Sequence, residues 1–278
     1  MFHRLTVLVA CAAALVLLVA PAAPAAPPHR IVSLSPSATE SLFAVGAGKQ
    51  VVAVDDQSDY PKRAPHTTLS GFTPNVEAIA AYNPDLVVVQ YDSGGIVEAL
   101  RKLSIRVLVQ PSAKNLVVAY GQIRQLGSVT GHKKAAAAVV ARMKKAITRA
   151  LKSTPRRRVS VYHELSPDYY SATSKTFIGG IYKLFGLRNI ADAAAGGGSD
   201  YPQLSAEYIL GANPGLVVLA DTRCCGQSVA SVANRPGWSN VAAVRTRSVV
   251  AIDDSVASRW GPRIVQFVQA VARVLKRH

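Results

Sequence analysis

A repeat within the chain limits the fold more than any other feature of the sequence. The segment 77–89 is matched by the segment 207–219, and all matched positions keep one spacing. The motif Ser-Asp-Tyr-Pro also occurs twice, at 58–61 and at 199–202. Each copy contains the loop motif, a helix start at Glu, an Asn-Pro pair and an apolar strand, in that order. The repeat therefore predicts two lobes of one architecture with a cleft between them.

Within each lobe, short apolar runs alternate with helical segments. The alternation resumes in the second half of the chain at 159–162 and ends in a C-terminal helix at about 262–276. Nearly continuous apolar strands separated by helices are typical of parallel sheets covered on both faces. We therefore expect two Rossmann-like α/β lobes. The expected strands of the first lobe are 31–34, 51–54, 85–89 and 106–109.

A sustained helical region, rich in Ala, Lys and Arg, separates the two lobes. It extends over about 116–151, and Gly127 and Gly131 are expected to divide it. A rigid helix between two α/β blocks gives the expected domain organisation: an N-terminal lobe at 26–130, an interlobe helix at 131–155 and a C-terminal lobe at 156–278.

The net charge of the chain is +16, from 32 Lys and Arg against 16 Asp and Glu. A charge of this size raises the question of nucleic acid binding. The excess is concentrated, because no acidic residue lies between Glu98 and Glu164 and basic residues crowd into 133–158. A solvated helix with a basic tail accounts for this pattern. Nucleic acid is therefore not an expected partner.

The N-terminal residues have the layout of a secretory signal. A single cation, Arg4, precedes an apolar run at 5–20, and Ala23 and Ala25 occupy the small-residue positions of a cleavage site. The apolar run is shorter than the ~20 residues that span a bilayer. We expect removal of residues 1–25 and export of the mature protein to the periplasm, the cell envelope or the extracellular space. A lipid anchor at Cys11, within Leu-Val-Ala-Cys, is the alternative.

The remaining cysteines, Cys224 and Cys225, are adjacent in the sequence and follow the apolar strand 216–219. Export places them in an oxidising environment, where disulfides persist. We expect a disulfide between these two neighbours, on a loop at the edge of the cleft. The alternative is a pair of reduced, buried thiols that act as small apolar groups.

Five segments of the chain carry a resemblance to a known family: Arg30–Glu40, Ser58–Pro61, Asn75–Glu77, Asn83–Val88 and Arg259–Arg263. Together they resemble the periplasmic cobalamin-, siderophore- and haem-binding proteins of ABC importers. The resemblance implies two α/β lobes bridged by one long helix, a monomer, and no catalysis. It implies capture of a cobalamin-like corrinoid or a ferric siderophore, followed by delivery to a membrane permease. Neither a cofactor nor a resident metal is expected.

The resemblance assigns roles to individual residues. Glu77 and Glu207 match the carboxylates that dock onto the permease, although each would also stabilise the start of its helix. Phe72, Tyr91 and Tyr201 match aromatic residues of the cobalamin cleft, where the family pattern has tryptophans that this chain lacks. Those missing tryptophans leave the identity of the chelate open.

Three further residues complete the expected binding site. Arg259 and the adjacent Trp260 match the cleft, and Arg259 is suited to amides, phosphate or carboxylates; alternatively it pairs with Asp253 and Asp254 nearby. His163 follows the first strand of the second lobe, where it either ligates a metal or makes an ordinary loop hydrogen bond. No structural-zinc spacing occurs in the sequence.

Two other functions remain open from the sequence. A haem- or metal-binding protein of the same fold would use His163 or a tyrosine of the cleft as its metal ligand. An exported enzyme on a doubly wound scaffold is the other, because a fold does not fix a function. The chain lacks the Gly-x-Ser-x-Gly sequence of a nucleophile elbow, which argues against that enzyme.

Overall fold

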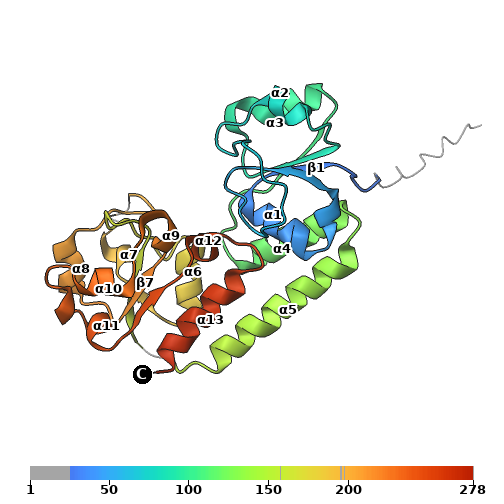
Figure 1. Ribbon diagram of the computed structural model, residues 1–278. Coiled ribbons are helices and arrows are strands. Elements are labelled where there is room, and N and C mark those ends of the chain that lie inside the picture. The colour runs from blue at the N-terminus through green and yellow to red at the C-terminus, as the bar shows by residue number, and fades with distance from the viewer. Residues whose placement is uncertain (1–25, 157, 195, 197, 278) are drawn as a thin grey trace, which may run out of the picture.

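The computed structural model describes the chain except for residues 1–25, 157, 195, 197 and 278. The predicted signal peptide and Cys11 therefore lie outside the described residues. The described chain forms two α/β lobes, each built on a sheet of four parallel strands (Figure 1). The first sheet contains β1 (Ile31–Leu34), β2 (Val51–Val54), β3 (Leu86–Val89) and β4 (Arg106–Val109). The second contains β5 (Ser160–Glu164), β6 (Arg188–Asn189), β7 (Leu216–Leu219) and β8 (Val249–Ala251).

The two sheets have the same strand order. The first is β2-β1-β3-β4 and the second is β6-β5-β7-β8, so each strand has a counterpart in the other lobe. The repeated Asn-Pro segments lead into β3 and β7, which are fully buried central strands. The α/β class and the two-lobe architecture predicted from the repeat are confirmed.

Helices cover both faces of each sheet. The first helix begins with Ser35, whose hydroxyl accepts a hydrogen bond from the amide of Ala38, and Pro36 occupies its first turn. Short 3₁₀ turns occupy Ala47–Gln50, Ser93–Gly95 and Trp238–Asn240. The N-terminal lobe has α1 (Pro36–Ala44), α2 (Val76–Ala80) and α3 (Ile96–Lys102). The C-terminal lobe has α6 (Phe177–Leu184), α7 (Ala191–Ala194), α8 (Ala206–Ala212), α9 (Thr222–Cys225), α10 (Val229–Ala233), α11 (Ala242–Arg245), α12 (Asp254–Ser258) and α13 (Ile264–Leu275).

Two helices lie between the lobes in sequence, α4 (Leu116–Val129) and α5 (Lys133–Lys152). Gly131 separates them with a positive φ of 82°, which glycine adopts without strain. Gly127, however, lies inside α4 and does not divide the helix. A Cβ at Gly127 would lie 2.2 Å from the Cβ of Ala136, so this glycine allows α4 and α5 to pack closely. The sequence cannot distinguish a helix-ending glycine from one required by packing.

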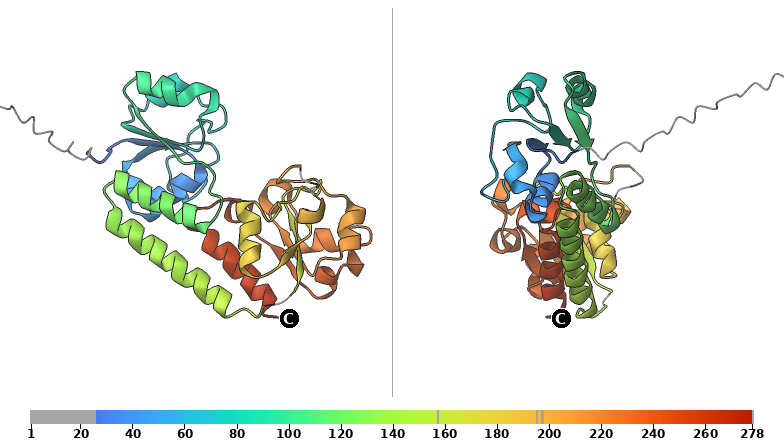
Figure 2. Two further views of the ribbon diagram at one scale, coloured as in Figure 1. Left: turned by 180° about the vertical axis from the view of Figure 1, so that it is seen from behind. Right: turned by 90° about the vertical axis from the view of Figure 1, so that its right-hand side faces the viewer.

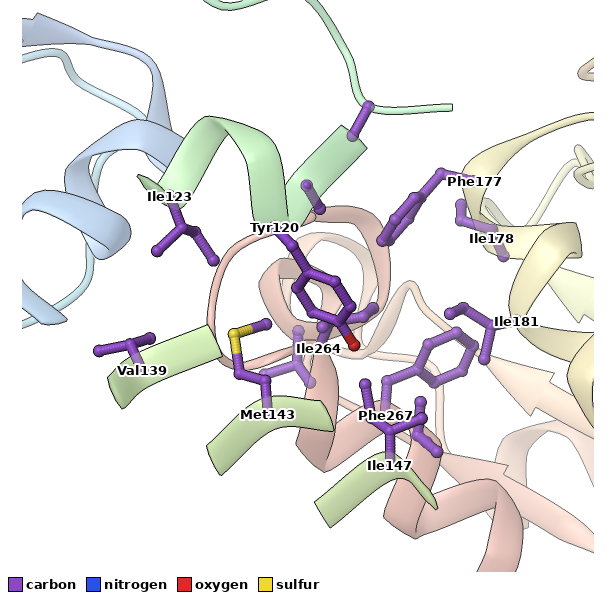
Figure 3. Close-up of a cluster of buried hydrophobic side chains, with 14 of the residues drawn as sticks. Tyr120, Ile123, Val139, Met143, Ile147, Phe177, Ile178, Ile181, Ile264 and Phe267 are labelled. Carbon is purple, nitrogen blue, oxygen red and sulfur yellow. The ribbon is translucent and has the colours of Figure 1, made fainter. Parts of the chain in front are cut away.

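The long helix α5 extends from the N-terminal lobe to the C-terminal lobe, and α13 packs beside it (Figures 1 and 2). One continuous cluster of buried apolar side chains crosses from one lobe to the other through these helices. Figure 3 shows Tyr120 of α4 and Met143 of α5 beside Phe177 of α6 and Phe267 of α13. The lobes therefore share a core.

No helix in the described part of the chain combines the length and the apolar composition needed to cross a bilayer.

Replacing Phe267 by Ala tests the importance of this shared core. Phe267 is fully buried, and its ring centroid lies 5.7 Å from that of Tyr182. Removing the ring leaves a cavity, so we expect the free energy of unfolding to fall by about 3–5 kcal/mol. Urea unfolding followed by circular dichroism measures this. Phe72→Ala is the control, since Phe72 is 65% exposed and its loss should change stability by less than about 0.5 kcal/mol. Equal losses in both variants would contradict the prediction.

Candidate ligand-binding cleft

Two adjoining hollows lie between the lobes. The first, of about 260 Å³, is lined by Phe72 and Tyr91 from the N-terminal lobe and by Trp260 from the C-terminal lobe, among others. The second, of about 610 Å³, is lined by residues that include Asp59 and Cys224. Gln57, Ser258 and Arg259 border both hollows, so the two form one cleft.

The cleft lies at the carboxyl ends of the strands in both sheets. Leu34 ends β1, Asp55 follows β2 and Gln90 follows β3, and all three line the first hollow. Ala220 follows β7 and lines the second hollow. Ligands of open α/β sheets bind at this edge because the loops that follow the strands converge there.

Four of the predicted ligand-binding residues line the first hollow: Phe72, Tyr91, Arg259 and Trp260. Phe72 is 65% exposed and Tyr91 is 40% exposed, so both rings are accessible to a ligand. The backbone of Phe72 is held in place because its carbonyl accepts a hydrogen bond of 2.7 Å from the hydroxyl of Ser93. This part of the lining is fixed by a polar contact while its apolar ring remains exposed.

Tyr201 does not line either hollow. It is 49% exposed, in the loop before α8. The matching Tyr60 of the first Ser-Asp-Tyr-Pro motif is also exposed, and the guanidinium of Arg263 lies 4.1 Å from its ring centroid. The two copies of the motif therefore have different surroundings, which the sequence alone does not reveal.

His163 is fully buried and lines neither hollow, so its expected place among the ligand-binding residues is corrected. Its Nδ1 lies 2.6 Å from the hydroxyl of Tyr182, and its ring packs against Phe267. Burial lowers the pKa of His163 to about 3, so the ring is neutral. The sequence suggested that the strand ends before His163, whereas β5 continues to Glu164. Inside the strand, His163 points to the side of the sheet covered by α6 and α13.

Asp59 joins the two lobes. Its carboxylate accepts hydrogen bonds from Arg259 at 2.6 Å and from Arg223 at 2.5 Å, and both arginines belong to the C-terminal lobe. Burial by itself would raise the pKa of Asp59, but the hydrogen bonds and positive charges of Arg259 and Arg223 lower it to about 2. Arg259 also donates to the carbonyl of Gln57 at 2.7 Å. Asp59 therefore stays ionised and holds both arginines in the cleft.

The alternative expectation that Arg259 pairs with Asp253 and Asp254 is corrected. Asp253 accepts a hydrogen bond from the amide of Ser255 and lies 3.6 Å from Arg223. Asp254 holds α9 in place, because it accepts hydrogen bonds from the backbone amides of Arg223 and Cys224. Asp59 was missed as the partner of Arg259 because contacts so distant in sequence leave no local pattern, although its repeated motif singled it out.

A second ion pair between the lobes lies beside the first. Glu40 of α1 is buried and accepts hydrogen bonds from Arg263, one of them at 3.0 Å from Nε. Burial raises the pKa of Glu40, and the hydrogen bond and charge of Arg263 oppose this effect. Gly261 approaches closely, since a Cβ there would lie 2.8 Å from Oε2 of Glu40. Glu40 and Arg263 belong to motifs that supported the family resemblance, but the contact between them was not predicted.

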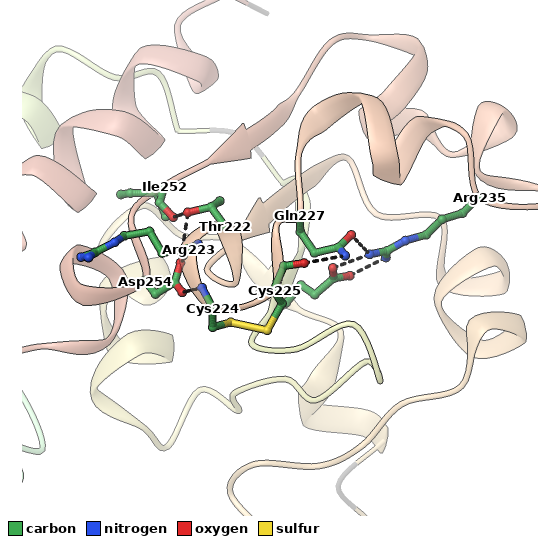
Figure 4. Close-up of a disulfide and its surroundings, with 9 residues drawn as sticks. Thr222, Arg223, Cys224, Cys225, Gln227, Arg235, Ile252 and Asp254 are labelled. Atoms are coloured by element: carbon green, nitrogen blue, oxygen red, sulfur yellow. Dashed lines mark hydrogen bonds and ion pairs between the residues drawn. A yellow bond between two sulfur atoms is a disulfide. The ribbon is translucent and has the colours of Figure 1, made fainter. Parts of the chain in front are cut away.

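Cys224 and Cys225 are joined by a disulfide in the structure, on the short helix α9 (Figure 4). Both cysteines are exposed, unlike the alternative of two buried thiols, and Cys224 lines the second hollow. Gly226 ends the helix with a φ of 66°. The pair thus forms a compact apolar edge on the C-terminal side of the cleft.

A buried polar cluster holds the segment that follows the disulfide. Glu164 ends β5, and Arg235 donates hydrogen bonds of 2.6 Å to each of its carboxylate oxygens. Arg235 also donates to Gln227 at 2.7 Å, which ties the cluster to the segment just after the disulfide (Figure 4). Asp221 is fully buried nearby, and burial followed by the negative charge of Glu164 raises its pKa. No pattern in the sequence pointed to this cluster.

Among the described residues, no group of three His, Cys, Asp or Glu side chains is arranged to hold a metal ion.

The chain belongs to the periplasmic binding protein family, whose model matches residues 31–256. It is 31% identical over 256 residues to the uncharacterized ABC transporter substrate-binding lipoprotein YvrC of Bacillus subtilis, covering 88% of this chain and 79% of that protein. It is 34% identical over 249 residues to a cobalamin-binding protein of Halobacterium salinarum, covering 86% of this chain and 67% of that protein. The chain is therefore a substrate-binding protein of an ABC transporter. Proteins of this kind bind small ligands and act with a membrane permease.

Solved structures confirm the fold. The vitamin B12-binding protein BtuF of Vibrio cholerae aligns with a TM-score of 0.74 at 24% identity, covering 90% of this chain and 97% of that chain. The haem-binding protein HutB of Vibrio cholerae aligns with a TM-score of 0.78 at 24% identity, covering 88% of this chain and 98% of that chain. Since proteins with different ligands match equally well, the fold does not identify the ligand.

The state of the two cysteines can be tested by alkylation. Mature protein unfolded without reductant should resist alkylation at Cys224 and Cys225, because both sulfurs are bonded. After reduction, each should take up one alkyl group, as read by intact mass. The control is Cys224→Ser, in which Cys225 should be alkylated without reductant. Alkylation of both cysteines in unreduced wild-type protein would show that they are free thiols.

Proposed function

We propose that this protein binds a corrinoid of the cobalamin type and delivers it to the permease of its transporter. The observation that carries this proposal is the exposed aromatic wall of Phe72 and Tyr91 in the first hollow, with Trp260 in the same lining. Grouped apolar rings on an exposed surface are typical of binding sites. A flat macrocycle would cover them and gain roughly 25 cal/mol for each Å² of apolar surface removed from water.

The charges of the cleft also favour this ligand. The two arginines that line the cleft, Arg223 and Arg259, are both paired with Asp59. A strongly anionic ferric siderophore would have to compete with Asp59 for these cations, at the cost of leaving a partly buried carboxylate without its partners. A corrinoid that carries peripheral amides needs no such exchange. The relative from Halobacterium salinarum, named as a cobalamin-binding protein, supports the same choice.

Titration with three chelates tests the proposal. Purified mature protein is mixed with cyanocobalamin, haemin and a ferric hydroxamate siderophore, and binding is followed by absorption spectroscopy and native mass spectrometry. We expect a stable complex with cyanocobalamin at one ligand per chain. Retention of haemin alone, with an absorption band typical of tyrosine-ligated iron, would assign the cleft to haem instead. Retention of the siderophore alone would assign it to an iron chelate.

Truncation of the aromatic wall provides a residue-level test. Phe72→Ala and Tyr91→Ala should each weaken cyanocobalamin binding by about 1–3 kcal/mol, as expected for aromatic anchors of a binding site. Tyr201→Ala is the matched control, because Tyr201 is similarly exposed but lies outside both hollows. Isothermal titration calorimetry measures the three affinities. A loss in Tyr201→Ala alone would place the ligand elsewhere.

We further propose that Glu77 and Glu207 contact basic residues of the permease. Both are exposed carboxylates in the first turn of a helix, α2 and α8, at matched positions of the repeat. These helices lie at the outer ends of the two lobes, far from α5 (Figure 1). Hydrogen bonds from its own backbone amide and from Ser205 lower the pKa of Glu207, so this carboxylate also stabilises its helix start.

The docking role is tested by reversing both charges. The double variant Glu77→Lys and Glu207→Lys should bind cyanocobalamin as the wild type does but should reduce uptake by about tenfold or more, since like charges would meet across the interface. Uptake of radiolabelled ligand is measured in cells with matched protein levels. Glu98→Lys is the control, because Glu98 is an exposed carboxylate in the first turn of α3 without a counterpart in the repeat. Equal uptake by the double variant and the wild type would exclude the docking role.

A further inference from the structure

The lining of the first hollow contains a carboxyl group that takes no part in the ion pairs of the cleft. Asp55 directly follows β2 and is only 1% exposed. Its backbone amide donates to the carbonyl of Ser33 at 3.1 Å, which fixes the start of the loop. A Cβ at Gly71 would lie 2.7 Å from Oδ2 of Asp55, so only a glycine leaves room beside this carboxyl. Both residues line the hollow.

The Oδ1 atom of Asp55 has no hydrogen-bond partner within the described structure. The charged groups that act on Asp55 are Asp56, on the same loop, and Arg259, from the other lobe. Arg259 already donates to Asp59 and to the carbonyl of Gln57, and Gly71 brings no charge. Burial raises the pKa of Asp55 to about 6, against the opposing effect of hydrogen bonds from Ser58.

A buried oxygen without a partner costs free energy, and a ligand that supplies the missing donor recovers it. An N–H group is such a donor, and its bond to an ionised carboxyl is stronger than one between neutral groups. A ligand carboxylate at the same place would bring two negative charges together or force one of them to take up a proton. Asp55 therefore distinguishes chelates whose outer groups are N–H donors from chelates whose outer groups are carboxylates.

We propose that Asp55 is a specificity-determining residue that selects chelates with peripheral N–H donors, such as primary carboxamides, over chelates with peripheral carboxylates. This inference rests on the proposed function, since it requires a chelate in the first hollow. The inference specifies the chemical class of the ligand group that contacts Asp55, at the carboxyl end of β2.

The two ligand classes also differ in the pH dependence of binding. An N–H donor stabilises the ionised form of Asp55, so binding of the amide strengthens as the pH rises through about 6. A ligand carboxylate instead accepts a hydrogen bond from protonated Asp55, so its binding strengthens as the pH falls through the same range. Asp55→Asn removes the titrating group, and the difference between wild type and variant isolates its effect from those of Asp56 and of the ligand.

The experiment uses two pairs of probes that differ only in this chemistry. One pair is dicyanocobinamide, which carries amides, and dicyanocobyrinic acid, which carries carboxylates. The other is the diamide of haemin and haemin itself. Dissociation constants are measured by absorption for wild type and Asp55→Asn, from pH 5 to 8. The wild type should prefer the amide of at least one pair by about tenfold or more at pH 7.5, and Asp55→Asn should remove most of this preference.

Each outcome has a separate meaning. If the wild type binds the corrinoid pair but Asp55→Asn keeps the same preference and the same pH profile, the inference about Asp55 is wrong and the proposed function stands. If the wild type binds the haemin pair alone, the proposed corrinoid function fails, and the inference about Asp55 is judged by whether Asp55→Asn removes the preference for the diamide. If the wild type binds none of the four probes, both the proposed function and the inference fail. Thermal unfolding checks that the variant is folded, and Asp55→Ser replaces it if Asp55→Asn does not fold. Tyr201→Ala, which should keep the wild-type preference, is the matched control.

Discussion

The carboxylate of Asp59 accepts hydrogen bonds from two arginines of the opposite lobe, and the shape of the cleft depends on this contact. The sheets of the two lobes do not pair with each other, and at the cleft the lobes are joined by the ion pairs of Asp59 and Glu40. Arg259 reaches both Asp59 and the carbonyl of Gln57, which fixes one loop of the N-terminal lobe against the C-terminal lobe. Asp200, in the second copy of the motif, remains exposed. Among the described residues, the ion pairs between the lobes therefore involve the first copy of the motif and not the second.

The ion pairs and the shared core restrict the movement of the lobes in different ways. The apolar cluster continues through α4, α5, α6 and α13, so wide separation of the lobes would expose its side chains to water. The pair between Arg223 and Asp59 is more easily broken, because the Arg223 side chain is 57% exposed and such pairs contribute about 0–1 kcal/mol. The Arg259 side chain is only 15% exposed, and its contact is the more constant one. These magnitudes favour a small closure in which Arg223 rearranges and Arg259 does not.

The sequence predicted the elements well and their side-chain contacts poorly. The apolar runs located β1, β2 and β4 at their observed bounds. The signal is continuous in β1 and β2 because these strands are almost wholly buried. His163 was misplaced because that signal ends where buried polar residues continue the strand, as they do in β5. The pairing of Arg259 with Asp59 depends on the meeting of two lobes. No local pattern records such a meeting, although the Ser-Asp-Tyr-Pro repeat pointed to the correct loop.

The net charge of +16 gives no guide to the charge of the ligand. The exposed cations of α5, such as Lys145 and Arg149, form no ion pair within the described residues. The helix α5 itself lies far from the tips at α2 and α8 (Figure 1). At physiological ionic strength a charge is screened beyond about 8 Å. Inside the cleft, Arg223 and Arg259 are paired with Asp59, and they also lie near Asp253 and Glu40 respectively. In the first hollow a ligand meets the aromatic wall and the carboxyl of Asp55, which under the proposal above select for shape and hydrogen-bond donors rather than for negative charge.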